Sequence, residues 1–111
     1  MVVLFGSRAK DTYNKFSDYD LLVIVRNENL MDKLKSIRRD SYSYSVDMKI
    51  YVLSEIKERV DNFDTILLDA FSGGKLIYDG LNKYNYIKEI VKGYINQKGL
   101  IKRSDGWFRK L

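Results

Sequence analysis

The sequence contains no cysteine, no histidine and no proline. Without cysteine the chain has no disulfide, no thiolate nucleophile and no cysteine-bound zinc. Without histidine it has no imidazole base and no imidazole metal ligand. Any chemistry must therefore rest on carboxylates, hydroxyls, amines and the backbone. A metal site built from carboxylates favours Mg²⁺ or Mn²⁺ over zinc.

Long hydrophobic runs and a signal sequence are also missing. The longest apolar runs, such as residues 21–25, have five residues, which is too short to span a bilayer. The first five residues lack the basic region and the length of a signal peptide. We therefore expect no membrane span and take the cytoplasm as the default location.

Length and charge suggest one domain with a basic end. The chain has 111 residues, 45% of them hydrophobic, which is enough to fill one core. Of the net charge of +5, four charges lie in residues 98–111, which contain five Lys or Arg and one Asp. We expect the folded domain to extend over residues 1–97. The basic, aromatic segment 98–111 either packs on this domain, as a C-terminal helix, or binds RNA or a partner. Because the positive charge is confined to one segment, the domain itself is not expected to bind nucleic acid directly.

Strands and helices are expected to alternate along the chain. Apolar runs and alternation predict strands over residues 2–5, 18–25, 46–53 and 75–78. Helical spacing predicts helices over residues 30–41, from a Ser54 cap to Gly73-Gly74, and from an Asn82 cap to Gly99. The expected fold is α/β, a mixed sheet of about four strands flanked by helices.

Three features near the strand ends point to phosphate chemistry. Gly6 and Ser7 form a turn after the first strand, where backbone amides and a hydroxyl can hold a phosphate. Asp18 and Asp20 point to the same side of the second strand, about 6 to 7 Å apart, and their charges call for a divalent cation. Asp47, on the third strand, can complete a second metal position and accept a proton. Together they predict a nucleotidyl or phosphoryl transfer site.

Each feature also has a structural explanation. Gly6-Ser7 can be a simple turn with a serine cap. Lys49 shares the face of Asp47 and offers it an ordinary ion pair. Arg8 and Lys10 either meet phosphates or are solvated. The two aspartates of the second strand favour the metal site, because a structural strand gains little from two acids on a face that continues as Leu22.

The stretches Leu4–Lys10 and Phe16–Val23 resemble the G-S-x10-D-x-D signature of the DNA polymerase beta nucleotidyltransferase superfamily. The spacer between Ser7 and Asp18 has the ten residues of that signature. The short chain and its Gly-Ser-Arg-Ala opening are most similar to the minimal nucleotidyltransferases, the antitoxins of HEPN toxin pairs. Two departures are Asp11, where the pattern usually has glycine, and the absence of a helix before the first strand.

The resemblance implies a role for each motif residue. Gly6 and Ser7 would bind the phosphates of ATP, with Arg8 and Lys10 beside them. Asp18 and Asp20 would ligate Mg²⁺, and Asp47 would be the third carboxylate and the base. The implied activity is transfer of AMP from ATP to a hydroxyl, expected to be a tyrosine, of a HEPN toxin.

Two rival interpretations remain at this point. The chain could mask the toxin by contact without catalysis, or it could modify a small molecule or RNA. The apolar strand 2–5 also needs cover on both faces. We expect either the 98–111 segment, self-association into a homo-oligomer or the partner to cover the side that the missing helix would shield.

Overall fold

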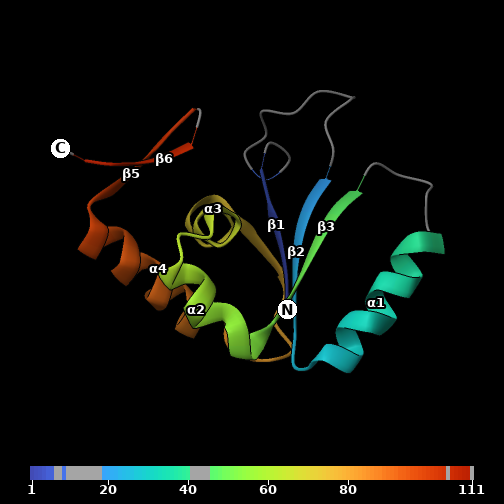
Figure 1. The fold of residues 1–111 in the computed structure, drawn as a ribbon. Coiled ribbons are helices and arrows are strands. Elements are labelled where there is room, and N and C mark those ends of the chain that lie inside the picture. The colour runs from blue at the N-terminus through green and yellow to red at the C-terminus, as the bar shows by residue number, and fades with distance from the viewer. Residues whose placement is uncertain (7–8, 10–18, 41–45, 105, 111) are drawn as a thin grey trace.

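The structure, a computed structural model, describes residues 1–6, 9, 19–40, 46–104 and 106–110, with only the backbone of residues 36–40. Its elements follow in chain order (Figure 1): β1 Val2–Phe5, β2 Tyr19–Val25, α1 Glu28–Asp40, β3 Val46–Val52, a 3-10 turn Leu53–Glu55, α2 Ile56–Asp61, α3 Thr65–Gly73, β4 Lys75–Tyr78, α4 Tyr84–Lys98, β5 Leu100–Arg103 and β6 Gly106–Arg109.

Four strands form one mixed sheet in the order β3-β2-β1-β4. β2 and β3 are parallel, whereas β1 is antiparallel to both β2 and β4. Helix α1 lies on one side of the sheet, and α2, α3 and α4 lie on the other (Figure 1). The predicted mixed sheet flanked by helices is confirmed.

Alternation along the strands divides the hydrophobic residues between the two faces. Leu22 and Ile24 of β2 point into a large cluster with the residues of α2, α3 and α4. Val23 and Val25, at the intervening positions, form a small cluster with Ile50 and its neighbours on the α1 side. Because side chains of a strand alternate between faces, β2 holds both layers of the core together.

The single helix predicted from Ser54 to Gly74 is wrong, because the chain breaks between α2 and α3. Phe63 adopts a left-handed backbone conformation, with φ of 63°, and its side chain is 40% exposed. Asp64 then caps α3, its Oδ1 accepting from the backbone N–H groups of Ile66 at 3.0 Å and Leu67 at 3.2 Å. The predicted Ser54 cap is also absent, since a 3-10 turn precedes α2 and no side chain caps either element.

The start of α4 also differs from the prediction. Asn82 has a φ of 56° in the turn before the helix, a conformation that asparagine tolerates better than most residues. Asp79 supplies the cap instead, accepting from the backbone N–H groups of Lys83 at 3.2 Å and Tyr84 at 3.0 Å. The predicted end at Gly99 is confirmed, with a left-handed φ of 61°.

The C-terminal segment forms an antiparallel hairpin of β5 and β6 rather than a helix. One carboxylate oxygen of Asp69, in α3, accepts from Lys102 Nζ at 2.7 Å and from Trp107 Nε1 at 2.8 Å. Leu100 is buried in the large cluster, and Trp107 packs against it. The hairpin therefore packs on the α3 side of the domain.

The side of β1 that faces α1 is not covered by the hairpin in the described part of the chain. Val2 packs against the small cluster on the α1 side, and no hairpin residue belongs to that cluster among the described residues. Self-association or partner binding there stays a prediction. Within the described part of the chain, no helix is both long enough and apolar enough to cross a membrane.

Candidate functional site

The predicted site lies where β1 ends and where β2 and β3 begin, at the upper edge of the sheet in Figure 1. The topology brings these ends together because β1 is antiparallel to β2 and β2 is parallel to β3. Gly6 directly follows β1, while Asp20 and Asp47 are the second residues of β2 and β3. Three of the residues predicted from the sequence thus meet at one edge.

Asp20 and Asp47 are direct neighbours in the parallel pair. Adjacent strands lie about 5 Å apart, so the two carboxylates start from backbone positions close enough to share one cation. Both point to the face of the large cluster. Asp20 is on the same face of β2 as Leu22 and Ile24, and Asp47 is on the same face of β3 as Tyr51, because every second residue of a strand points to the same side. Asp20 is half-buried, whereas the Asp47 side chain is 50% exposed.

Gly6 lies against the carboxylate of Asp20. A Cβ at position 6 would stand 2.3 Å from Asp20 Oδ2, and the backbone has a φ of 76°. Both the close approach and the left-handed backbone conformation require glycine at this position. The glycine turn and the acidic strand are therefore parts of one site.

Lys49 is the next residue of β3 on the same face as Asp47. Its Nζ lies 3.5 Å from Asp47 Oδ1, and the two side chains are 44% and 50% exposed. The ion pair considered from the sequence is therefore formed. A pair exposed to this degree contributes about 0 to 1 kcal/mol to folding.

A second set of polar contacts joins β3 to the start of α3. The Tyr51 hydroxyl donates to Asp64 Oδ2 at 2.8 Å, and the Arg59 guanidinium lies 4.1 Å above the Tyr51 ring. Burial raises the pKa of Tyr51, and the hydrogen bond to Asp64 raises it further. The hydroxyl therefore remains a donor. Asp64 was not among the predicted residues, although aspartate is a preferred residue at the start of a helix.

The remaining predicted residues, Ser7, Arg8, Lys10 and Asp18, lie outside the described residues. In the described ranges no group of three or more acidic, histidine or cysteine side chains could hold a metal ion. The predicted triad requires Asp18 and so is not tested by this finding.

The described part of the site fits a hard divalent cation. Two carboxylates come from adjacent strands, and oxygen donors are the ligands that Mg²⁺ and Mn²⁺ prefer. The absence of a side chain at position 6 lets the Asp20 carboxylate lie directly against the turn. Asp20 and Asp47 are thus able to hold such an ion next to a turn that a phosphate could approach.

Comparison with known proteins agrees with this arrangement. The sequence model of the nucleotidyltransferase domain family matches residues 1–92. The chain therefore belongs to the nucleotidyltransferase domain family, as the sequence motif indicates. The β5–β6 hairpin lies beyond the matched residues.

Two individual proteins are similar to this chain. A protein from Methanocaldococcus jannaschii named "putative protein adenylyltransferase" is 29% identical over 96 residues. The match covers 80% of this chain and 65% of that protein, so the chain spans less than two thirds of its relative. A solved structure described as a toxin-antitoxin with AMP-PNP has a TM-score of 0.52 at 19% identity, over 88% of this chain and 76% of that one. This second likeness shows the fold.

Proposed function

We propose that this chain is a Mg²⁺-dependent nucleotidyltransferase that transfers AMP from ATP to a hydroxyl of a protein partner. One observation carries the proposal: Asp20 and Asp47 are paired across two strands on one face, with the Asp20 carboxylate against the backbone of Gly6. A carboxylate pair beside a glycine turn suits a metal-bound triphosphate.

In the proposed site each motif residue keeps the role implied by the family. The turn at Gly6 and Ser7 binds the outer phosphates, with Arg8 and Lys10 beside them. Asp18 and Asp20 hold Mg²⁺, or Mn²⁺ in its place, and Asp47 completes the carboxylate set. When bound, the metal supplies positive charge to the phosphates during transfer.

The reaction exchanges one bond to phosphorus for another. The acceptor oxygen bonds to the α-phosphorus, the bond from this phosphorus to the oxygen bridging to the β-phosphate breaks, and pyrophosphate leaves. Asp47 takes the proton of the acceptor hydroxyl, a role open to a half-exposed carboxylate at the edge of the site. Holding nucleotide and acceptor in line supplies most of the remaining catalysis.

The acceptor we propose is a tyrosine of a HEPN toxin, with the chain acting as its antitoxin. The name of the archaeal relative supports a protein acceptor, and the description of the similar structure supports pairing with a toxin. A helical partner with an R-x4-6-H motif, encoded beside this chain, would be the protein to test.

The test incubates that partner with this chain, ATP and Mg²⁺, and reads intact mass. The partner should gain the mass of one or more AMP units, and its ribonuclease activity should fall. The variant Asp47→Asn should still bind ATP but transfer little AMP. No added mass, together with a stable complex that inhibits the toxin, would favour a masking module over the enzyme. Transfer only to an added small molecule or RNA would overturn the protein acceptor.

A further inference from the structure

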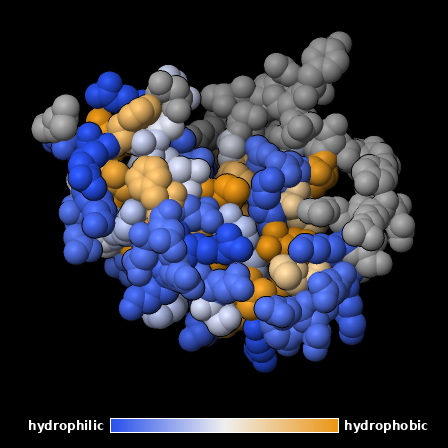
Figure 2. Space-filling model, viewed as in Figure 1, coloured by the Kyte–Doolittle hydropathy of each residue, from blue (hydrophilic) through white to orange (hydrophobic). Residues whose placement is uncertain are grey.

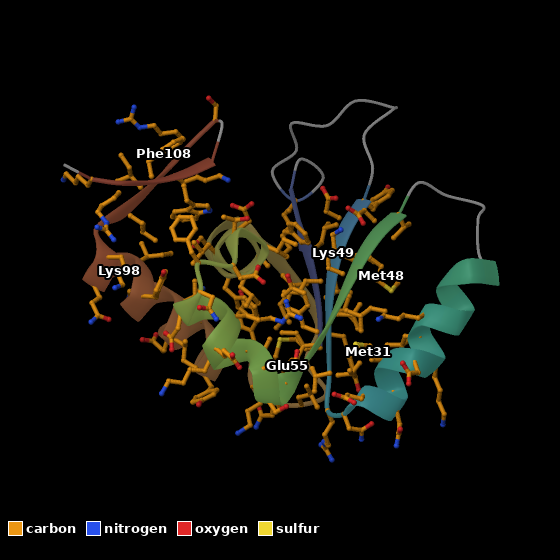
Figure 3. All side chains as sticks on the ribbon, in the orientation of Figure 1. Met31, Met48, Lys49, Glu55, Lys98 and Phe108 are labelled. Atoms are coloured by element: carbon orange, nitrogen blue, oxygen red, sulfur yellow. The ribbon has the colours of Figure 1, made fainter. Side chains whose placement is uncertain are left out.

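Lys49 lies two residues along β3 from Asp47, at the next position on the same face. Its register partner on β2 is Leu22, and this pair is the next one after Asp20–Asp47 on the same face. Figure 3 shows Lys49 and Met48 leaving β3 toward opposite sides of the sheet. Met48 packs against the small cluster, which leaves Lys49 on the face of the carboxylates. The ammonium group thus belongs to the site by position.

We propose that Lys49 is a nucleotide-binding residue that changes partners: it pairs with Asp47 in the empty site and binds a phosphate of the nucleotide when the metal is bound. This inference rests on the proposed function. It assigns a residue outside the family's motif to that function.

The contact with Asp47 is suited to exchange rather than to folding. The Nζ–Oδ1 distance is 3.5 Å, longer than the 2.7 Å of the Lys102–Asp69 pair that fastens the hairpin. Both side chains are close to half exposed, so water screens the attraction. A loosely held ammonium group can therefore be displaced from Asp47 by a cation of higher charge.

Charge determines where the displaced ammonium group goes. A divalent ion on Asp47 repels this group, which nevertheless remains near the site because its stem starts from β3. A triphosphate brings several negative charges to the same place, and lysine binds phosphate as a compact point charge with three donors. Lys49 should thus oppose binding of the metal alone but favour binding of the metal with the nucleotide.

Two other cations of the described residues on this side of the sheet, Arg59 and Lys102, have different contacts. Arg59 lies over the Tyr51 ring and within 3.6 Å of Asp64, away from the strand ends. Lys102 is held by Asp69. Neither contact involves Asp20 or Asp47, whereas that of Lys49 does.

Calorimetry on the full chain tests the proposal, with Mg²⁺ alone and with ATP in excess Mg²⁺ as the two probes. Relative to wild type, Lys49→Met should bind Mg²⁺ alone about twofold to threefold more tightly, because a weak competitor is gone. The same variant should bind ATP with Mg²⁺ about tenfold more weakly, since one charge-assisted contact to phosphate is lost. Lys49→Arg, which keeps the charge, should restore most of the ATP affinity.

The matched control is Lys33→Met, which removes the same charge from an exposed position of α1 on the other side of the sheet. If Lys49→Met and Lys33→Met give the same two affinities, the proposal is wrong. Weaker binding of both probes in Lys49→Met, with a lower melting temperature, would assign Lys49 a structural role instead.

The outcome also separates this inference from the function on which it rests. If wild type binds no ATP with Mg²⁺, the proposed function fails and the role of Lys49 fails with it. If wild type binds ATP, Asp20→Asn does not, and Lys49→Met behaves like the control, then only the role of Lys49 is overturned.

Discussion

The two faces of the sheet differ greatly in how much core they carry. Among the described residues, fifteen buried side chains form the cluster on the side of α2, α3 and α4, and four form the cluster under α1. The carboxylates of the site project from the first face. Asp20 and Asp47 thus begin strand faces whose inner residues Leu22, Ile24 and Tyr51 belong to the larger core.

This difference indicates why that face suits the site. A ligand must find its binding groups already in place, and a large, close-packed cluster holds the strands beneath them. Figure 2, which shows both helical layers from the side, has hydrophilic residues over much of the visible surface and hydrophobic residues exposed between them. The face under α1 contributes less core and none of the described site residues.

The largest loss of stability is expected when an isoleucine is replaced by alanine in either core cluster, and the two losses can be compared. Ile24 lies in the large cluster at 1% exposure, and Ile50 lies in the small one at 9%. We expect Ile24→Ala to lower the free energy of unfolding by about 4 kcal/mol and Ile50→Ala by about 2 kcal/mol. Urea denaturation measures both, and equal losses would contradict the comparison.

The next largest effect is expected when Asp64, the residue that joins β3 to α3, is replaced. Asp64→Ala takes away the cap of α3 and the acceptor of the Tyr51 hydroxyl. We expect a loss of about 2 kcal/mol in the free energy of unfolding. Asp61→Ala, at an exposed site of α2, serves as the control and should change stability by less than about 0.5 kcal/mol. A similar loss in both variants would argue against this role of Asp64.

The hairpin should depend on one carboxylate. Asp69→Ala leaves Lys102 and Trp107 without the acceptor that they share. We expect a loss of about 1.5 kcal/mol and faster amide hydrogen exchange in β5 and β6. Arg103→Ala, at an exposed position of the same hairpin, should leave exchange unchanged. Unchanged exchange in Asp69→Ala would show that the apolar contacts of Leu100 hold the hairpin alone.

The smallest effect concerns the start of α4 and depends on pH. Desolvation works to raise the pKa of Asp79, but hydrogen bonds from the backbone of Tyr84 and Lys83 outweigh it and hold this pKa below its ordinary value. The folded chain thus binds the proton less readily than the unfolded chain, so the stabilisation is present at neutral pH and is lost on acidification.

We expect Asp79→Ala to cost about 1 kcal/mol at pH 7. The difference from wild type should shrink as the pH falls below about 4. Asn82→Gly is the control, because glycine accepts the left-handed conformation at that position. A larger loss in Asn82→Gly, or a difference for Asp79→Ala that does not change with pH, would contradict the assignment of the cap.

The sequence predicted the sheet better than the helix boundaries, and for a physical reason. Alternation along residues 46–52 identifies both a strand and its two faces, so this pattern alone places Asp47 on the side of Asp20. The stripe through Ile56, Val60 and Leu67 fits one long helix equally well as two short ones. The break depends on a local competition that periodicity does not register, in which Asp64 bonds to backbone groups of the next turn.

The site was predictable where a motif names its residues and less so elsewhere. Gly6 followed from the turn signal, but only the structure shows that its missing side chain makes room for Asp20. The hairpin was not predicted because Trp107 and Lys102 both donate to Asp69, which lies more than thirty residues away in the sequence. Contacts at such separation leave no periodic trace in the sequence.

The central claim is most directly tested by calorimetric titration of ATP into the full chain, with and without Mg²⁺. The account predicts that wild type binds ATP only with Mg²⁺ and that Asp20→Asn weakens this binding at least about tenfold while keeping the melting temperature close to that of wild type. ATP binding by Asp20→Asn with unchanged affinity, or binding by wild type that does not depend on the metal, would contradict it.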